Sequence, residues 1–161
     1  MILILMGVTG SGKTTIGQLL SRQLGWEFRD ADGFHSAANV AKMRAAIPLT
    51  DEDRRPWLES IRAYIQARFV AGQHSIIACS ALKEAYRQIL GGDDSRIQFV
   101  YLKGEVGLLR DRLEKRRGHY MNPALLQSQI DTLEVPRDVF TATIDQTPEE
   151  IAARIRDHFH I

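Results

Sequence analysis

The sequence lacks the features of a disulfide-bonded, membrane-spanning or nucleic-acid-binding protein. Its only cysteine is Cys79, so no disulfide can form within the chain. The 21 lysines and arginines are balanced by 20 aspartates and glutamates, and a net charge of +1 provides no strongly basic surface. The apolar segment 2–6 is too short for a signal peptide or a membrane span. We therefore expect a cytoplasmic protein that binds neither nucleic acid nor membrane.

The length and composition favour one folded unit. A chain of 161 residues with 44% hydrophobic residues is long and apolar enough for one core, and it contains no repeat or low-complexity linker. We expect a single domain spanning 1–161. Cys79 ends the apolar run 75–79 and has no histidine beside it in the sequence, which favours a buried small residue over a nucleophile.

The strongest pattern in the sequence is Gly-Val-Thr-Gly-Ser-Gly-Lys-Thr at 7–14, which matches G-x-x-x-x-G-K-[ST] at each fixed position. An apolar run precedes it and apolar residues at helical spacing follow, so we expect a strand, a phosphate-binding loop and a helix. The glycines let backbone N–H groups surround an anion at the positive end of the helix. We expect Lys13 to reach the β- and γ-phosphates of ATP and the Thr14 hydroxyl to ligate Mg²⁺. The residues predicted to bind the nucleotide are Gly7, Val8, Thr9, Gly10, Ser11, Gly12, Lys13 and Thr14.

The order of predicted elements indicates an α/β fold. Strands are expected at 2–6, 26–28, 74–79, 97–102 and 139–144. Helical segments separate them, which predicts a five-stranded parallel sheet covered on both faces. Two helices between the second and third strands, within 36–72, form a longer excursion than a crossover needs, and we interpret them as a substrate-covering insertion.

Two carboxylates follow the second predicted strand, Asp30 and Asp32. On an extended segment their side chains would point the same way, at the sheet edge where ligands bind. One could hold Mg²⁺ while the other takes a proton from an acceptor hydroxyl. We prefer Asp32 as the base and Asp30 on the metal side, although the reverse assignment stays open. The alternative for such a pair is a solvated turn that caps a helix.

Two absences narrow the class of phosphate-loop protein. The chain has no Asn-Lys-x-Asp segment, which a GTPase uses to bind its base. The third and fourth predicted strands end in 78–80 and 102–104 without the acidic Mg²⁺ ligand usual in motor and transport ATPases. Both absences argue against these two classes, and the carboxylates lie instead after the second strand, as Asp30 and Asp32.

A basic cluster lies on and after a predicted helix at 105–115. Arg112 and Arg116 share one helix face, and Arg117 and His119 follow. In a protein with a phosphate loop we interpret this cluster as part of a lid, 112–135, that places guanidinium groups against the transferred phosphoryl group. Arg112 and Arg116 are thus predicted to bind ATP, with Arg116 also catalytic. The alternative is a solvated basic face.

With these segments in view, the sequence resembles the gluconate kinases, short P-loop sugar-acid kinases related to shikimate kinase and the nucleoside monophosphate kinases. The resemblance rests on the following segments: 6–14, 30–35 with Asn39 and 42–43, 48–58, 79–83 with 86–87, 101–104, and 112–113 with 116 and 118–119. It implies a P-loop kinase fold and Mg²⁺- and ATP-dependent phosphorylation of the terminal hydroxyl of D-gluconate. The product, 6-phosphogluconate, would feed the pentose phosphate route. Because a dimer is common among these relatives, the resemblance also implies a homodimer.

A polyhydroxy acid needs a cation for its carboxylate and hydrogen-bonding groups for its hydroxyls. The predicted substrate-binding residues are Asp30, Asp32, His35, Asn39, Lys42, Arg54 and Arg87. Lys83 and Tyr86 follow the third strand at the same sheet edge and could lie near the substrate; the alternative is that they are solvated helix residues. Trp57 begins a regular helical stripe of apolar residues, which favours a core position over a platform for a sugar. The competing functions are a kinase for shikimate or a nucleoside monophosphate, and a slow nucleotide-dependent switch.

Overall fold

The computed structural model describes residues 1–45, 47–115 and 123–161. Its strands are β1 (Ile2–Met6), β2 (Glu27–Asp30), β3 (Ser75–Ala78), β4 (Ile97–Lys103) and β5 (Phe140–Thr143). Its helices are α1 (Lys13–Leu24), α2 (Ala37–Arg44), α3 (Asp51–Val70), α4 (Glu84–Leu90), α5 (Val106–Lys115), α6 (Pro123–Thr132) and α7 (Pro148–Phe159), with a 3₁₀ turn η1 (Ala31–Phe34) after β2. Within the described residues, no helix is both long and apolar enough to span a membrane.

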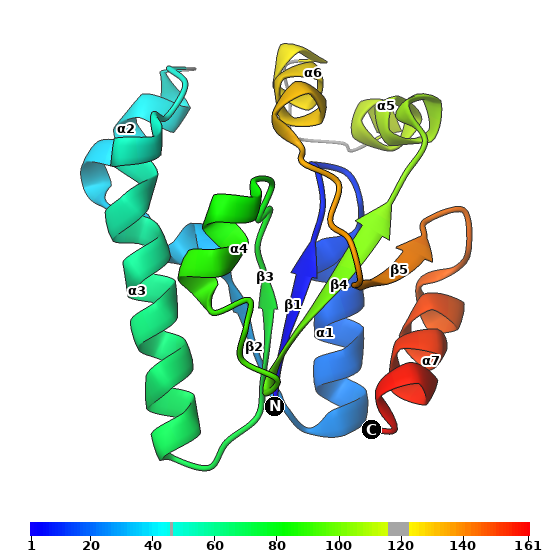
Figure 1. Ribbon diagram of the computed structural model, residues 1–161. Coiled ribbons are helices and arrows are strands. Elements are labelled where there is room, and N and C mark those ends of the chain that lie inside the picture. Colours follow the sequence, from blue (N-terminus) through cyan, green and yellow to red (C-terminus); the bar gives the residue numbers. More distant parts are fainter. Residues whose placement is uncertain (46, 116–122) are drawn as a thin grey trace.

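The five strands form one parallel sheet in the order β2-β3-β1-β4-β5 (Figure 1). This confirms the predicted α/β fold. Strand β1 lies at the centre and each of its residues is fully buried, because neighbouring strands flank it and helices cover both faces. The carboxyl ends of the strands meet at one edge of the sheet, and α2, α5 and α6 lie beyond that edge (Figure 1).

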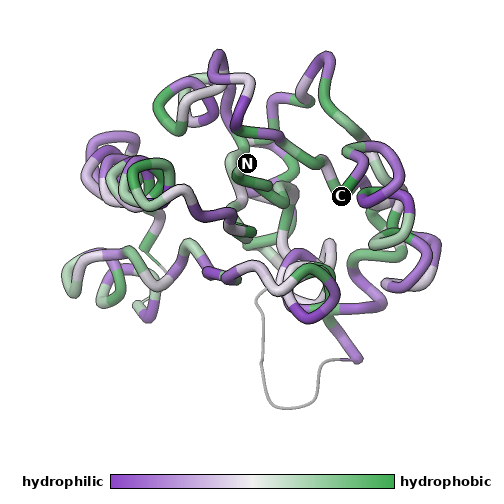
Figure 2. The backbone as a smooth tube through the Cα atoms, turned by 90° about the horizontal axis from the view of Figure 1, so that it is seen from below, coloured by the Kyte–Doolittle hydropathy of each residue, from purple (hydrophilic) through white to green (hydrophobic). Residues whose placement is uncertain are grey.

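Successive side chains of β1 pack into two hydrophobic cores, one on each face of the sheet. Leu3 and Leu5 pack into the core that includes residues of α1 and α7, while Ile4 packs into the core that includes residues of α3 and α4. Trp57 is 4% exposed in the second core, as predicted. Figure 2 shows the hydrophobic strands at the centre, with hydrophilic stretches along the surrounding helices.

The helix ends follow local sequence signals. Gly25 adopts the left-handed conformation that ends α1, and Thr147 with Glu150 forms a capping box at the start of α7. Cys79 is buried, and burial raises the pKa of its thiol to about 12, which confirms an inert core cysteine.

One local prediction was wrong. We expected Asp30 and Asp32 on one extended segment, but β2 ends at Asp30 and Asp32 lies in the 3₁₀ turn η1. The reason is local: the Asp30 side chain accepts a hydrogen bond from the Asp32 N–H at 3.0 Å and so caps the turn.

Candidate active site

The segment between β1 and α1 forms a tight loop at the carboxyl edge of the sheet. Gly7 has a φ of +141°, and a Cβ there would lie 2.8 Å from the carbonyl oxygen of Leu102. Gly12, with a φ of +93°, precedes the first residue of α1. The first N–H groups of α1 therefore lie at the loop, as an anion site at a helix N-terminus requires.

Lys13 lies against this loop. Its Nζ donates hydrogen bonds to the carbonyl oxygens of Gly7 and Val8, at 2.9 and 3.0 Å. Ser11, within the loop, is fully buried and lies close to Gly7. The predicted phosphate-loop residues are therefore assembled in one strand–loop–helix unit.

The Thr14 hydroxyl lies next to the end of β2. Its Oγ1 donates a hydrogen bond to Asp30 Oδ2 at 3.3 Å, while the other Asp30 oxygen caps η1. A hydroxyl and a carboxylate at this separation are the hard oxygen donors that suit Mg²⁺. Asp30 thus caps a turn and at the same time offers an oxygen beside the phosphate loop.

Asp32 lies in a different electrostatic environment. It reaches solvent, but the surrounding protein partly desolvates its carboxylate, and this burial together with the negative charge of Asp30 raises its pKa. The charges of His35 and Lys13 act in the opposite direction. Asp32 therefore lies within electrostatic reach of the phosphate-loop lysine, and its raised pKa suits a proton acceptor.

His35 joins this site to α3. Its ring stacks on Trp57, with the ring centroids 4.4 Å apart and the planes 10° apart. Burial lowers the pKa of His35, an effect that the Asp32 carboxylate opposes and the Arg54 charge reinforces. Asn39 Nδ2 lies 3.4 Å from His35 Nδ1 and donates to the Asp53 carbonyl oxygen at 2.8 Å. Asn39 is buried, and these contacts hold its side chain between η1 and α3.

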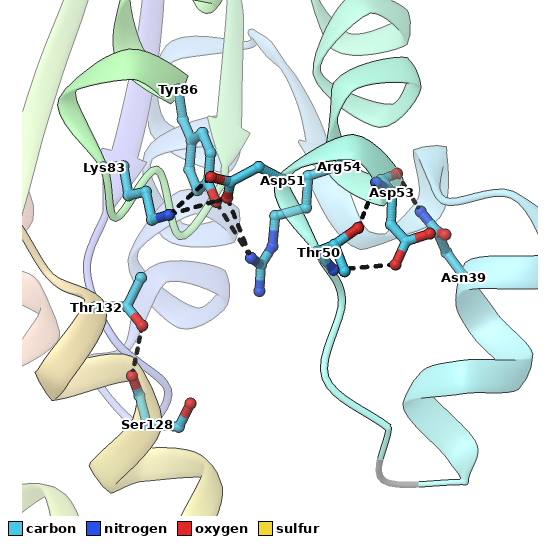
Figure 3. A network of polar contacts seen from close by, with 9 residues as sticks. All are labelled: Asn39, Thr50, Asp51, Asp53, Arg54, Lys83, Tyr86, Ser128 and Thr132. Atoms are coloured by element: carbon cyan, nitrogen blue, oxygen red, sulfur yellow. Dashed lines mark hydrogen bonds and ion pairs between the residues drawn. The ribbon is translucent and has the colours of Figure 1, made fainter.

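A second polar network lies where the start of α3 meets the loop before α4 (Figure 3). The Asp51 carboxylate accepts hydrogen bonds from Lys83 Nζ, at 2.9 and 3.0 Å, and from the Tyr86 hydroxyl. Arg54 donates to the Tyr86 hydroxyl at 3.1 Å. The network contains two cations, one carboxylate and one phenol.

Arg112 lies on the opposite side of the phosphate loop. Its guanidinium donates to the carbonyl oxygen of Ile144, which follows β5. A Cβ on Gly12 would lie 3.8 Å from Arg112 Nη1, so this cation is close to the loop. A cavity of about 140 Å³ opens beside Ile144 between β4, β5 and α5.

Comparison with known proteins gives a matching family model and a relative that covers nearly the whole chain. A family model for shikimate kinase matches residues 9–158. A gluconokinase from Gluconobacter oxydans is 43% identical over 160 residues, which cover 98% of this chain and 90% of that protein. The chain belongs to the gluconokinase family.

Two solved structures agree. A sugar kinase from Janibacter superimposes with a TM-score of 0.91 at 43% identity, over 99% of this chain and 94% of that one. A gluconokinase from Sinorhizobium meliloti superimposes with a TM-score of 0.82 at 35% identity, over 98% and 94% of the two chains. The resemblance inferred from the sequence is thereby confirmed, and this gluconokinase-family chain has the P-loop kinase fold.

The structure brings together most of the site residues predicted for this gluconokinase-family member. The loop residues, Asp30 and Asp32 lie at one sheet edge, and His35, Asn39 and Arg54 extend this group toward α3. Lys42 lies farther along α2, and its Nζ donates to both carboxylate oxygens of Asp53 at 2.8 Å. Arg116, with the basic residues after it, lies outside the described residues, so its predicted contact with ATP stays a prediction.

Arg87 is placed differently from what its predicted role suggests. Its side chain is 4% exposed and donates to the Glu84 carboxylate, at 2.6 and 3.0 Å, and to the carbonyl oxygens of Ala81 and Leu82. These contacts fix the loop between β3 and α4. The predicted contact of Arg87 with substrate stays untested, while its observed contacts are structural.

Asp51, Lys83 and Tyr86 are the polar residues that the predicted site omitted. The available signal was that Lys83 and Tyr86 follow β3 at the carboxyl edge, where open parallel sheets bind their ligands. Sequence alone could not separate them from solvated helix residues, because their partner Asp51 lies 32 and 35 residues away.

Proposed function

We propose that this protein transfers the γ-phosphoryl group of ATP to the terminal hydroxyl of D-gluconate, giving 6-phospho-D-gluconate. The observation that carries the proposal is the contact between Thr14 and Asp30, because it joins the phosphate loop to the carboxylate-bearing turn. The choice of acceptor is supported by the gluconokinase from Gluconobacter oxydans, which is 43% identical over 98% of this chain.

The nucleotide would bind across the phosphate loop. The loop N–H groups and the start of α1 would hold the β-phosphate, and Lys13 would reach the β- and γ-phosphates. Arg112 lies close enough to the loop to contact ATP, and Arg116 is proposed to neutralise the transferred group. Thr14 and Asp30 would hold Mg²⁺, which supplies charge neutralisation of the phosphates when bound.

Asp32 is the proposed base. In its ionised form it would accept the proton of the acceptor hydroxyl as the hydroxyl oxygen bonds to the γ-phosphorus and the bond to the ADP oxygen breaks. Its position within reach of Lys13 and His35 supports this role over that of Asp30, whose two oxygens already contact Thr14 and the Asp32 N–H.

The acceptor would lie between η1, α2 and the start of α3. His35 and Asn39 offer hydrogen-bonding groups to the hydroxyls, and Arg54 offers a cation to the carboxylate. Lys42 and Arg87 would contribute by fixing α2 and the loop after β3, given their contacts with Asp53 and Glu84. We propose that 36–72 covers the acceptor and that 112–135 forms a lid within the single domain 1–161.

The direct test is ADP release from Mg·ATP by the purified chain, with D-gluconate, shikimate, AMP or no acceptor in parallel. We expect turnover with D-gluconate and far slower ADP release without acceptor, because a closed site excludes water as nucleophile. The shikimate arm matters because the matching family model is that of shikimate kinase. Turnover with shikimate or AMP but not D-gluconate would contradict the proposal.

A further inference from the structure

The carboxylate of Asp51 is surrounded by donors in the way that the carboxylate of a bound ligand would be. Asp51 receives hydrogen bonds from Lys83 and Tyr86, and its Oδ1 lies 3.9 Å from Arg54 Nη1. The donors come from two elements, α3 and the segment at the start of α4, and Figure 3 shows them directed at the same carboxylate. Two cations and a phenol around one carboxylate form a general carboxylate-binding site.

This site remains accessible. The Lys83 and Arg54 side chains are 31% and 28% exposed, and Asp51 itself is 62% exposed in the first turn of α3. Exposed ion pairs of this kind contribute little to stability, so replacing one carboxylate by another costs little. Asp51 can therefore give up its donors to a carboxylate in solution without unfolding α3.

The site also lies next to the proposed acceptor region. Trp57 lies one turn after Arg54 on α3, and its ring stacks on His35. Its Nε1 donates to the carbonyl oxygen of Ala31, the residue before Asp32, at 2.7 Å. A polyhydroxy acid with its carboxylate among Arg54, Lys83 and Tyr86 would thus extend past His35 toward Asp32. This order matches an acceptor whose charged end and reacting hydroxyl are at opposite ends of the molecule.

We propose that Lys83, Tyr86 and Arg54 form the subsite for the carboxylate of the acceptor acid, and that Asp51 is an internal carboxylate that competes for it. The proposal rests on the proposed function and adds Lys83, Tyr86 and Asp51 to its specificity-determining residues. Asp51 therefore affects which acids bind: an acid displaces Asp51 only if its carboxylate binds Lys83, Tyr86 and Arg54 more tightly than Asp51 does.

The proposal predicts effects of opposite sign from the two ends of one ion pair. Lys83→Met removes a charged donor and should raise the KM for D-gluconate about 10- to 100-fold, with the KM for ATP unchanged. Asp51→Asn removes the competitor and should lower the KM for D-gluconate several-fold. A purely structural ion pair would instead give changes of the same sign from both variants.

The experiment measures steady-state kinetics of the full chain with Mg·ATP and either D-gluconate or its uncharged analogue D-glucitol. Turnover of the unsubstituted chain with D-gluconate tests the proposed function before any variant is compared. Lys83→Met should reduce kcat/KM for D-gluconate but not for D-glucitol, and Lys83→Arg should restore part of the loss. The double variant should have a KM for D-gluconate between those of the two single variants, because Asp51 still competes for Tyr86 and Arg54 once Lys83 is replaced.

A matched control is available at the other end of the sheet, before β4. Asp94 and Arg96 form a surface ion pair at 2.7 Å, so Asp94→Asn and Arg96→Met should leave both KM values unchanged. The inference is overturned if Asp51→Asn raises the KM for D-gluconate, or if Lys83→Met affects D-gluconate and D-glucitol equally. Thermal unfolding of each variant confirms that the compared proteins are folded.

Discussion

The side-chain oxygen of Gln129 accepts a hydrogen bond from the backbone N–H of Thr9 at 2.6 Å, across 120 residues of sequence. This contact joins α6 to the phosphate loop. Just after α6, the N–H of Glu134 donates to the Leu82 carbonyl oxygen at 2.9 Å, and its carboxylate accepts from the N–H of Glu84 at 2.6 Å. The α6 segment therefore contacts both the proposed nucleotide site and the loop that carries Lys83.

Gln129→Ala should raise the KM for ATP. The lost hydrogen bond leaves the loop less well fixed, and one neutral hydrogen bond corresponds to a change of about two- to ten-fold. The KM for D-gluconate should stay the same. Gln127→Ala is the matched control, because Gln127 lies on the same helix and its side chain donates to Asp131. Equal ATP kinetics for the two variants would contradict a role for Gln129.

Asp32→Asn should lower kcat about 100-fold or more if Asp32 is the base. The variant should fold normally, since burial and the nearby Asp30 charge already disfavour the ionised form. Because the pKa of Asp32 is raised, the carboxylate forms only as the pH rises through that higher value, and activity should rise with it. The acidic limb of kcat/KM should thus lie above the ordinary aspartate pKa of about 3.9. Near-normal turnover of the variant would assign the base elsewhere.

Asp53 should stabilise the fold except in acid. Hydrogen bonds from Lys42 and from the Thr50 N–H lower the pKa of Asp53 to about 2. Its contribution is therefore present above the unfolded-state pKa of about 3.9 and is lost as the pH falls toward the folded-state value. Melting temperatures from pH 7 to pH 2 should fall less steeply for Asp53→Asn than for the unsubstituted chain. Parallel curves would show that the Lys42 pair adds nothing.

Arg87→Met should destabilise the protein rather than weaken acceptor binding. The change removes donors from the carbonyl oxygens of Ala81 and Leu82 in a buried setting, which costs about 3 kcal/mol. We expect a melting temperature lower by roughly 10 °C. The KM for D-gluconate should change little at a temperature where the variant is folded. A raised KM with unchanged stability would instead support the substrate contact predicted from sequence.

The fold was predictable because its signals are local. Short apolar runs predicted the five strands, and the segments with helical periodicity between them predicted the helices. The phosphate loop predicted which edge of the sheet holds the site. The position of Asp32 was not predictable in this way. Asp32 lies in a 3₁₀ turn because the Asp30 side chain caps that turn. The same sequence is equally compatible with a strand that continues through Asp32.

Contacts between charged residues that are distant in the sequence were also not predictable. The chain has 21 basic and 20 acidic residues, and nothing local pairs Asp51 with Lys83 until α3 packs near α4. Arg87 shows the converse case, since an arginine is normally exposed and its burial here depends on Glu84 and two loop carbonyls. Sequence identified the cations at the sheet edge but not which of them are already paired.

The central claim is phosphoryl transfer to the terminal hydroxyl of D-gluconate, and ³¹P NMR of the reaction product tests it most directly. We predict one new phosphomonoester signal, split into a triplet by the two protons of the terminal methylene group, that appears only when the chain, Mg·ATP and D-gluconate are combined. A doublet would place the phosphate on a secondary hydroxyl, and inorganic phosphate alone would indicate hydrolysis. Either result would contradict the account.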